Sequence, residues 1–301
     1  MRFLISKAVK YQYGRCLSIL TLVFFSQLAA AACPSDAQVK QYLSAFAKRQ
    51  ASQGFGQDIG LEDAQCARQK LGAELPLYLG KRVGYKAVFT APTDPSSRSS
   101  ASGAAAVSTF NGRLDWGYVF DRNLVDIIAV LPAQFGARPV YQASLIIEVS
   151  DPRFAEAKTV QDALAYVDSV TPFIELPDLM MEGPLSDNAY LSINLGFKGG
   201  VLGQEIKVNE NSRRLIGEQL TRMVVVVTEN DQEVARTPLG HPMEAALALA
   251  RALKKEGIQL KRGDFLCLGG FSPPKTPQSG LKLNVRYEGL GNSPSLGIEF
   301  N

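Results

Sequence analysis

The sequence contains a single histidine among its 301 residues, and none of its four cysteines belongs to a C-x-x-C pair. A lone His241 excludes a metal centre built from several imidazole ligands. Cysteine metal sites need closely spaced pairs, so they are excluded as well. Neither sign of charge dominates, with 32 basic and 29 acidic residues and a formal net charge of +3. The composition therefore indicates neither a nucleic-acid partner nor an anionic surface.

The amino terminus has no apolar run of the roughly 20 residues that a bilayer-spanning helix needs. Residues 1–32 instead combine a basic start, a shorter apolar stretch from Leu17 to Leu28, and an alanine-rich end before Cys33. This arrangement predicts a secretory signal peptide over residues 1–32, export to the periplasm, and no stable membrane span after cleavage. An uncleaved anchor and a lipoprotein acylated on Cys33 are the alternatives, and Ala30 disfavours the second because lipoprotein signals usually have leucine there.

The mature chain is predicted to open with a helical segment over residues 33–75. Val39–Ala51 and Leu61–Leu71 carry apolar residues at helical spacing. Cys33 precedes the first pattern and Cys66 lies in the second. The two thiols can therefore bridge a helical hairpin, and such a bond would stabilise an exported protein by about 3–4 kcal/mol.

Residues 76–301 read as a second domain of short strands with few helices. Asp94–Ser108 is rich in serine and other small residues, which indicates a loop that is either a lid or a solvated linker. Helices are expected at Val160–Val167 and Met243–Glu256. Strands are expected at Val125–Leu131, Tyr141–Val149, Pro172–Leu176, Leu191–Leu195, Met223–Thr228, Phe265–Leu268 and Leu281–Tyr287. The order and type of these predicted helices and strands together indicate an α+β fold class.

The stretch from Leu239 to Gly270 is the most informative part of the chain. Pro242 stands near the start of a helix, where its missing N–H does no harm. Gly257 ends that helix, and the apolar strand Phe265–Leu268 follows, with Cys267 as a core thiol. The segment therefore predicts a turn, a helix, a second turn and a buried strand in succession.

This stretch resembles the signature of the 2-keto-4-pentenoate hydratase family in the fumarylacetoacetase-like superfamily. Collinear segments resemble other family motifs: Gly80–Tyr85 (G-R-K-V-G-L), Trp116–Phe120 (F-G-x-L-F), Val170–Glu175 (L-P-A-L-E-V), Ser186–Ala189 (A-D-N-A) and Glu288–Gly291 (E-G-I-G). The resemblance implies a mixed β-roll or barrel with peripheral helices. It also implies a hydratase-type lyase that acts on a small 2-keto acid. By analogy with the family, the chain is expected to form a homo-oligomer.

The resemblance implies a divalent cation, Mg²⁺ or Mn²⁺, held by three carboxylates and chelated by the keto acid. Two of these acids come from an E-x-E pair, whose members share one strand face. In this chain the pair falls on Gln142 and Ser144, while the third position is Glu175. Glu148 stands about 13 Å beyond Ser144 along an extended strand and cannot replace them. A buried Glu175 without its metal must be protonated or paired with a cation.

Four further residues are candidates for catalysis by the same resemblance. The family lysine falls on Arg82, with Lys86 four residues on; either could bind a substrate carboxylate, although arginine is a poor proton shuttle. Asp187 belongs to the matched polar pair and is either a pocket group or a turn residue. His241 precedes the matched helix, where a structural role competes with a substrate contact.

Two hypotheses of different class remain. In one, the protein is an exported lyase of the 2-keto-4-pentenoate hydratase type with a weakly held Mg²⁺ or Mn²⁺. In the other, it is a catalytically degenerate relative that binds a small anionic ligand or a partner protein in the periplasm. The exchange of two metal carboxylates and of the lysine favours the second, whereas the retained Glu175, Asp187 and His241 favour the first.

Overall fold

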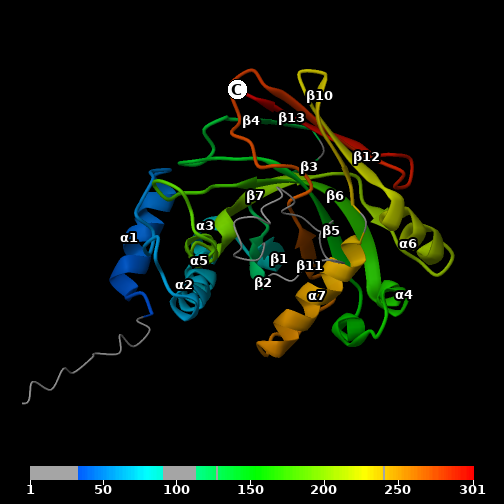
Figure 1. Ribbon diagram of the computed structural model, residues 1–301, viewed down its shortest axis with the longest axis horizontal. Coiled ribbons are helices and arrows are strands. Elements are labelled where there is room, and N and C mark those ends of the chain that lie inside the picture. The colour runs from blue at the N-terminus through cyan, green and yellow to red at the C-terminus, as the bar shows by residue number, and fades with distance from the viewer. Residues whose placement is uncertain (1–32, 91–112, 127, 240) are drawn as a thin grey trace, which may run out of the picture. The chain divides into compact units, whose positions relative to one another are not determined.

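Two β-sheets organise the chain in the computed structural model, which describes residues 33–90, 113–126, 128–239 and 241–301 (Figure 1). Residues 33–301 form one unit. The predicted signal peptide and the predicted loop Asp94–Ser108 lie outside the described residues. Among the described residues, no helix has the length and apolar character needed to cross a bilayer.

The larger sheet is mixed, with the strand order β2-β1-β11-β5-β6-β7-β3 and with β8 paired to β6. Its members are β1 (Arg82–Thr90), β2 (Arg113–Phe120), β3 (Leu124–Asp126), β5 (Gln142–Val149), β6 (Val167–Pro177), β7 (Phe197–Leu202), β8 (Ile206–Lys207) and β11 (Phe265–Leu268). β1 and β11 run parallel, whereas β11, β5, β6 and β7 are antiparallel neighbours. This order places β1 close to β5 and β6, although some 60 to 90 residues separate them in the chain.

The smaller sheet has the order β10-β9-β12-β13-β4. Its strands are β4 (Ile128–Leu131), β9 (Val224–Glu229), β10 (Gln232–Pro238), β12 (Lys282–Glu288) and β13 (Ser295–Phe300). β12 alternates exposed and buried residues, as expected for a sheet with one face on the core and one in water. The expected strand Val125–Leu131 is therefore two short strands, β3 and β4, that belong to different sheets.

Helices flank these sheets, which gives the α+β arrangement that the sequence predicts. They are α1 (Asp36–Ala47), α2 (Leu61–Glu74), α3 (Pro76–Leu79), α4 (Val160–Ala163), α5 (Asp187–Ser192), α6 (Arg213–Arg222) and α7 (Pro242–Lys255). Short 3₁₀ turns lie at η3 (Pro152–Glu156), η4 (Leu164–Tyr166) and η5 (Asn194–Gly196). In Figure 1 the small sheet lies at the top, α1 and α2 at the left and α7 below the strands.

The predicted amino-terminal hairpin is present. Ser35 begins α1 with a capping box, in which its hydroxyl accepts from the backbone N–H of Gln38. A disulfide joins Cys33 to Cys66 on α2, with the two Cα atoms 5.6 Å apart. The predicted bridge is confirmed, and Cys33 is a disulfide partner in this structure.

The expected strand at Leu191–Leu195 is wrong, because the segment is the end of α5 followed by η5. Ser186 caps α5 by accepting from the N–H of Ala189, a helix-start signal that the apolar run concealed. The helix expected at Val160–Val167 is divided into α4 and η4, and Val167 already begins β6. In contrast, Phe265–Leu268 is β11 as predicted, and Gly257 follows the end of α7 with a left-handed φ of 79°.

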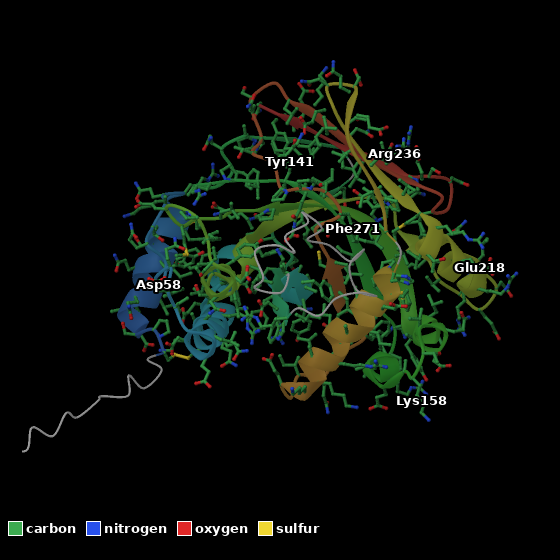
Figure 2. The ribbon with its side chains drawn as sticks, in the orientation of Figure 1. Asp58, Tyr141, Lys158, Glu218, Arg236 and Phe271 are labelled. Atoms are coloured by element: carbon green, nitrogen blue, oxygen red, sulfur yellow. A yellow bond between two sulfur atoms is a disulfide. The ribbon has the colours of Figure 1, made fainter. Side chains whose placement is uncertain are left out.

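Buried side chains from both sheets and from the helices form one main hydrophobic core. Figure 2 places Tyr141 and Phe271 in the interior, whereas Asp58, Lys158 and Glu218 lie at the periphery. Tyr141 and Phe271 are 2% and 1% exposed, consistent with that placement. The core therefore supports the strand ends that carry the site described next.

Candidate functional site

A cavity of about 320 Å³ opens at one end of β1, β5 and β6 and is named here the main pocket. Most of its wall is apolar, and polar groups come from a few side chains. The lining residues are Val88, Phe89, Val140, Gln142, Pro177, Leu179, Leu185, Ser186, Asp187, Tyr190, Gly269, Gly270 and Pro274. Such a concave, mostly apolar wall with a few polar groups is typical of small-molecule sites.

Strand register gathers the three candidate metal-site residues beside this pocket. Gln142 on β5 lies directly opposite Glu175 on β6, and Ser144 lies opposite Phe173. Because paired residues share a face, Gln142, Ser144 and Glu175 point to the same side of the sheet. A Cβ placed on Gly269 would lie 2.9 Å from Glu175 Oε2, 3.1 Å from Gln142 Nε2 and 3.8 Å from Ser144 Oγ. Gly269 therefore leaves open the small space onto which all three converge.

Lys86 enters the same space from β1 and forms an ion pair with Glu175 Oε1. The Lys86 and Glu175 side chains are 1% and 0% exposed. Lys86 Nζ also donates to the carbonyl of Leu195 at 2.9 Å and lies 5.8 Å from the centre of the Tyr190 ring. Burial disfavours the ammonium, but the Glu175 carboxylate and the nearby Tyr190 together outweigh burial, so the pKa of Lys86 is raised above its usual value.

The two neutral side chains are also committed to protein partners. The Gln142 amide donates from Nε2 to Glu175 Oε2 at 3.0 Å. The Ser144 hydroxyl donates to the carbonyl of Leu268 at 2.8 Å and lies 3.4 Å from Cys267 Sγ. Burial raises the pKa of the Cys267 thiol above its ordinary range, so it remains an uncharged core group, as predicted.

These donors do not fit a divalent cation. A hard cation of this kind prefers several anionic oxygen ligands, and the set contains one carboxylate. Lys86 occupies one oxygen of that carboxylate and the Gln142 amide nitrogen occupies the other. A dication would have to displace a buried ammonium of like charge. The geometry is that of a neutral, internally paired Lys–Glu unit.

Glu148 does not supply the missing charge. It pairs with Ser169, six residues before Glu175 on β6, or about 20 Å along the strand. Its carboxylate accepts from the Ser169 hydroxyl at 2.8 Å. Glu148, Asp168 and Glu205 approach one another near Lys207, which pairs with the last two. This acidic group belongs to the far end of the strand pair.

Asp187 lies at the rim of the main pocket, as the first residue of α5. It is exposed, and it contributes to raising the pKa of Asp115, for which burial is the leading cause. The neighbouring Asn188 donates to the carbonyl of Ile59 at 3.1 Å. Asp187 therefore gives the pocket entrance a negative charge.

The loop between α1 and α2 holds this rim. The Gln53 and Gln57 amides donate to Glu182 Oε2 and to the Glu182 carbonyl, at 2.6 and 2.8 Å. The Ser186 hydroxyl donates to the carbonyl of Gln57 at 2.7 Å. The amino-terminal hairpin thus positions one wall of the main pocket, a relationship that no local sequence signal could indicate.

Two of the predicted catalytic residues lie away from the Lys86–Glu175 pair. Arg82 is exposed at the start of β1, where a bulge places its guanidinium 5.5 Å from the ring centres of Tyr85 and Tyr118. His241 is the residue before α7, 40% exposed, with Nδ1 3.2 Å from Glu244 Oε1. Neither residue lines the main pocket. Tyr190, which sequence reasoning missed, does line it.

No family model matches the chain. The chain is 27% identical over 193 residues to 2-keto-4-pentenoate hydratase 2 of Dechloromonas aromatica. This alignment covers 60% of this chain and 69% of that protein. It is 24% identical over 189 residues to 4-oxalocrotonate decarboxylase of Pseudomonas putida, which covers 59% and 67%.

Among solved structures, the fold is similar to that of 4-oxalocrotonate decarboxylase from Pseudomonas putida G7 complexed with magnesium and adipate. The TM-score is 0.68 at 20% identity, over 88% of this chain and 96% of that one. The complex of the same enzyme with calcium and acetate gives a TM-score of 0.66 at the same identity and coverage. The mixed β-roll with peripheral helices expected from the sequence is therefore confirmed.

Proposed function

Because the chain belongs to the 2-keto-4-pentenoate hydratase family of the fumarylacetoacetase-like superfamily, we propose that its main pocket binds a small 2-keto carboxylate. We further propose that it does so without a divalent cation. The hydratase and decarboxylase relatives support the ligand class, and the structure of one relative contains magnesium and adipate. In this chain the ammonium of Lys86 takes the place of the cation.

The observation that carries this proposal is the buried ion pair between Lys86 and Glu175. The pair balances the charge of the one remaining family carboxylate. It leaves no anionic oxygen in the set formed by Gln142, Ser144 and Glu175 that is free to bind a dication. A metal-polarised ketone is therefore not part of the proposed function, and the protein acts as a binding relative of the lyases.

The main pocket supports a ligand with an apolar body and a small polar head. Its volume of about 320 Å³ lies at the lower end of the range for small-molecule sites. Val88, Val140 and Pro177 form apolar wall, whereas Gln142 and Tyr190 bring polar atoms to the end nearest the ion pair. The keto and carboxylate oxygens are expected to accept hydrogen bonds at that end.

A metal-dependent lyase of the hydratase type is the second candidate. It is favoured by one observation, the convergence of Gln142, Ser144 and Glu175 on the space beside Gly269. In this alternative, Mg²⁺ or Mn²⁺ displaces Lys86 from Glu175, and Asp187 at the rim is the remaining acid–base candidate.

Calorimetric titration with Mg²⁺ and with Mn²⁺ separates the two candidates. For the wild-type chain we expect no binding tighter than about 1 mM, because Lys86 opposes the cation. A variant with Lys86→Thr, Gln142→Glu and Ser144→Glu restores three carboxylates and removes the ammonium, and it should bind at least about tenfold more tightly. Micromolar binding by the wild-type chain, lost in Glu175→Ala, would establish the lyase reading instead.

Ligand binding is tested with 2-oxopentanoate, a saturated five-carbon 2-keto acid, in the presence of EDTA. Saturable binding that EDTA leaves unchanged supports the proposal. Gly269→Ala should abolish it, because the added Cβ would stand 2.9 Å from Glu175 Oε2. Gly60→Ala is the matched control, since its Cβ would meet only Asp63 Oδ2 at 3.5 Å. Turnover of 2-keto-4-pentenoate that EDTA stops would refute the proposal.

Export to an oxidising compartment is part of the proposed function. The disulfide between Cys33 and Cys66 supports it, because such bonds persist mainly outside the cytoplasm. Cleavage after residue 32 is tested by amino-terminal sequencing of the protein recovered from the periplasm. A homo-oligomer, expected by analogy with relatives, is tested by sedimentation velocity.

A further inference from the structure

A second cavity of about 240 Å³ lies away from the main pocket. It is formed where the end of α1, the turn between β2 and β3, and the first residues of β7 meet the segment after β4. The lining residues are Arg49, Arg122, Asn123, Val125, Leu131, Pro132, Phe135, Leu176, Lys198 and Gly199. None of them lines the main pocket.

Strand β6 separates the two cavities. Pro177 lines the main pocket and Leu176 lines the second cavity, and consecutive strand residues point to opposite faces. A ligand in the second cavity therefore contacts neither Lys86 nor Glu175.

Three cationic side chains surround the second cavity. Lys198 is 12% exposed, with Nζ 3.3 Å from the carbonyl of Phe46 and 3.5 Å from the centre of its ring. Arg49 donates to the carbonyl of Gln134 at 3.4 Å, and Arg122 donates to main-chain carbonyls of α3. In the part of the chain that the structure describes, no carboxylate pairs with either arginine.

Among the described residues, Asp178 is the acid that lies within ion-pair distance of Lys198, and most of its hydrogen-bonding capacity is taken up by backbone groups. Its carboxylate accepts from the backbone N–H groups of Ala137, Arg138 and Met180 at 3.0, 2.8 and 3.2 Å. Its distance to Lys198 Nζ is 3.7 Å, longer than a hydrogen bond. Burial, followed by the charge of Arg49, lowers the pKa of Lys198 despite Asp178, which indicates that the positive charge is not fully balanced.

Apart from Asn123, the rest of the wall is apolar and includes Val125, Leu131, Phe135 and Leu176. A rim of guanidinium and ammonium groups over such a floor suits an anion that has a hydrocarbon body. An arginine fork binds a carboxylate through two parallel hydrogen bonds, and the apolar floor disfavours a fully hydrated inorganic anion.

We propose that the cavity between Arg49, Arg122 and Lys198 is a second ligand site, which binds a small monocarboxylate with an aliphatic body. The carboxylate lies between the two arginines, and the hydrocarbon chain lies against Phe135 and Leu176. The site is independent of the chemistry at the main pocket.

Isothermal titration of the intact chain with hexanoate tests this site. Arg49→Gln and Arg122→Gln should each raise the Kd about tenfold, since each removes a charge-assisted contact. Arg222→Gln removes the same charge from the exposed end of α6 and should leave the Kd unchanged. Gly269→Ala, which blocks the main pocket, should also leave it unchanged. Thermal melts confirm that each variant is folded.

Inorganic phosphate is titrated in parallel to distinguish a carboxylate site from a general anion site. Binding of hexanoate at least about tenfold tighter than phosphate supports the proposal. Comparable phosphate binding, hexanoate binding that survives both arginine substitutions, or no saturable hexanoate binding would each overturn it.

Discussion

The Lys86 ammonium and the Glu175 carboxylate form an ion pair that is almost completely removed from water, with the two side chains 1% and 0% exposed. The pair joins β1 to β6 across β11 and β5. A buried Glu requires a cation or a proton, and here the protein supplies the cation from its own chain. The pair therefore commits the one carboxylate among Gln142, Ser144 and Glu175 to a cation from the same chain.

Replacing only one member of the Lys86–Glu175 pair should destabilise the fold. Lys86→Met leaves Glu175 buried without a counter-charge and should lower the free energy of unfolding by about 3–5 kcal/mol, measured by urea denaturation at pH 7. The double variant Lys86→Met/Glu175→Leu removes both charges and should recover most of that loss. If the double variant is as unstable as the single one, the unpaired charge of Glu175 does not explain the loss.

The hairpin disulfide should stabilise both the fold and the pocket rim. Cys33→Ser/Cys66→Ser opens a loop spanning 33 residues and should lower the free energy of unfolding by about 3–4 kcal/mol. The loop between α1 and α2 bonds to Glu182 and Ser186, so amides of residues 182–188 should exchange hydrogen faster in this variant.

Dithiothreitol provides the control for this prediction. It should reproduce both effects in the wild-type chain and add nothing in the double serine variant. Unchanged exchange at residues 182–188 would mean that contacts other than the hairpin hold the rim.

Sequence reasoning succeeded where the determining signals are local. Pro242 and Gly257 bracket α7 within a residue or two, and β11 follows as an apolar run after a glycine turn. The Cys33–Cys66 bridge could be predicted because each cysteine lies beside or within a helical pattern. The prediction from sequence failed at Leu191–Leu195, where a short apolar run does not distinguish a strand from a buried helical turn.

The partner of Lys86 could not be predicted from local pattern. Strands β11 and β5 lie between β1 and β6, and the register of the pairings decides which residues face each other. In this register Lys86 lies beside Cys267 and Gln142 lies opposite Glu175. These pairings join segments far apart in the sequence, so they depend on the whole sheet. The need of Glu175 for a counter-ion was evident from its apolar strand, whereas the identity of that counter-ion was not.

A third prediction concerns acid stability and the contact between the two sheets. Glu229 at the end of β9 accepts hydrogen bonds from the Tyr141 hydroxyl and from Lys275 Nζ, the latter at 2.7 Å. Partial burial alone would raise the pKa of Glu229. The two donors outweigh it, so the pKa lies below the ordinary value of 4.5.

A carboxyl with a depressed folded-state pKa stabilises the protein above its unfolded pKa and loses that contribution as the pH falls through the folded value. Glu229→Gln should therefore cost on the order of 1 kcal/mol at pH 7, discounted for the 22% exposure of the carboxylate, and the cost should fade below about pH 4. Urea unfolding of both proteins from pH 7 to pH 3 measures this difference. In a Lys275→Met background the loss should be smaller and should be complete at a higher pH, because one of the two donors that depress the folded-state pKa is gone. A difference between wild type and Glu229→Gln that stays constant across this range would show that Glu229 acts through packing and not through its charge.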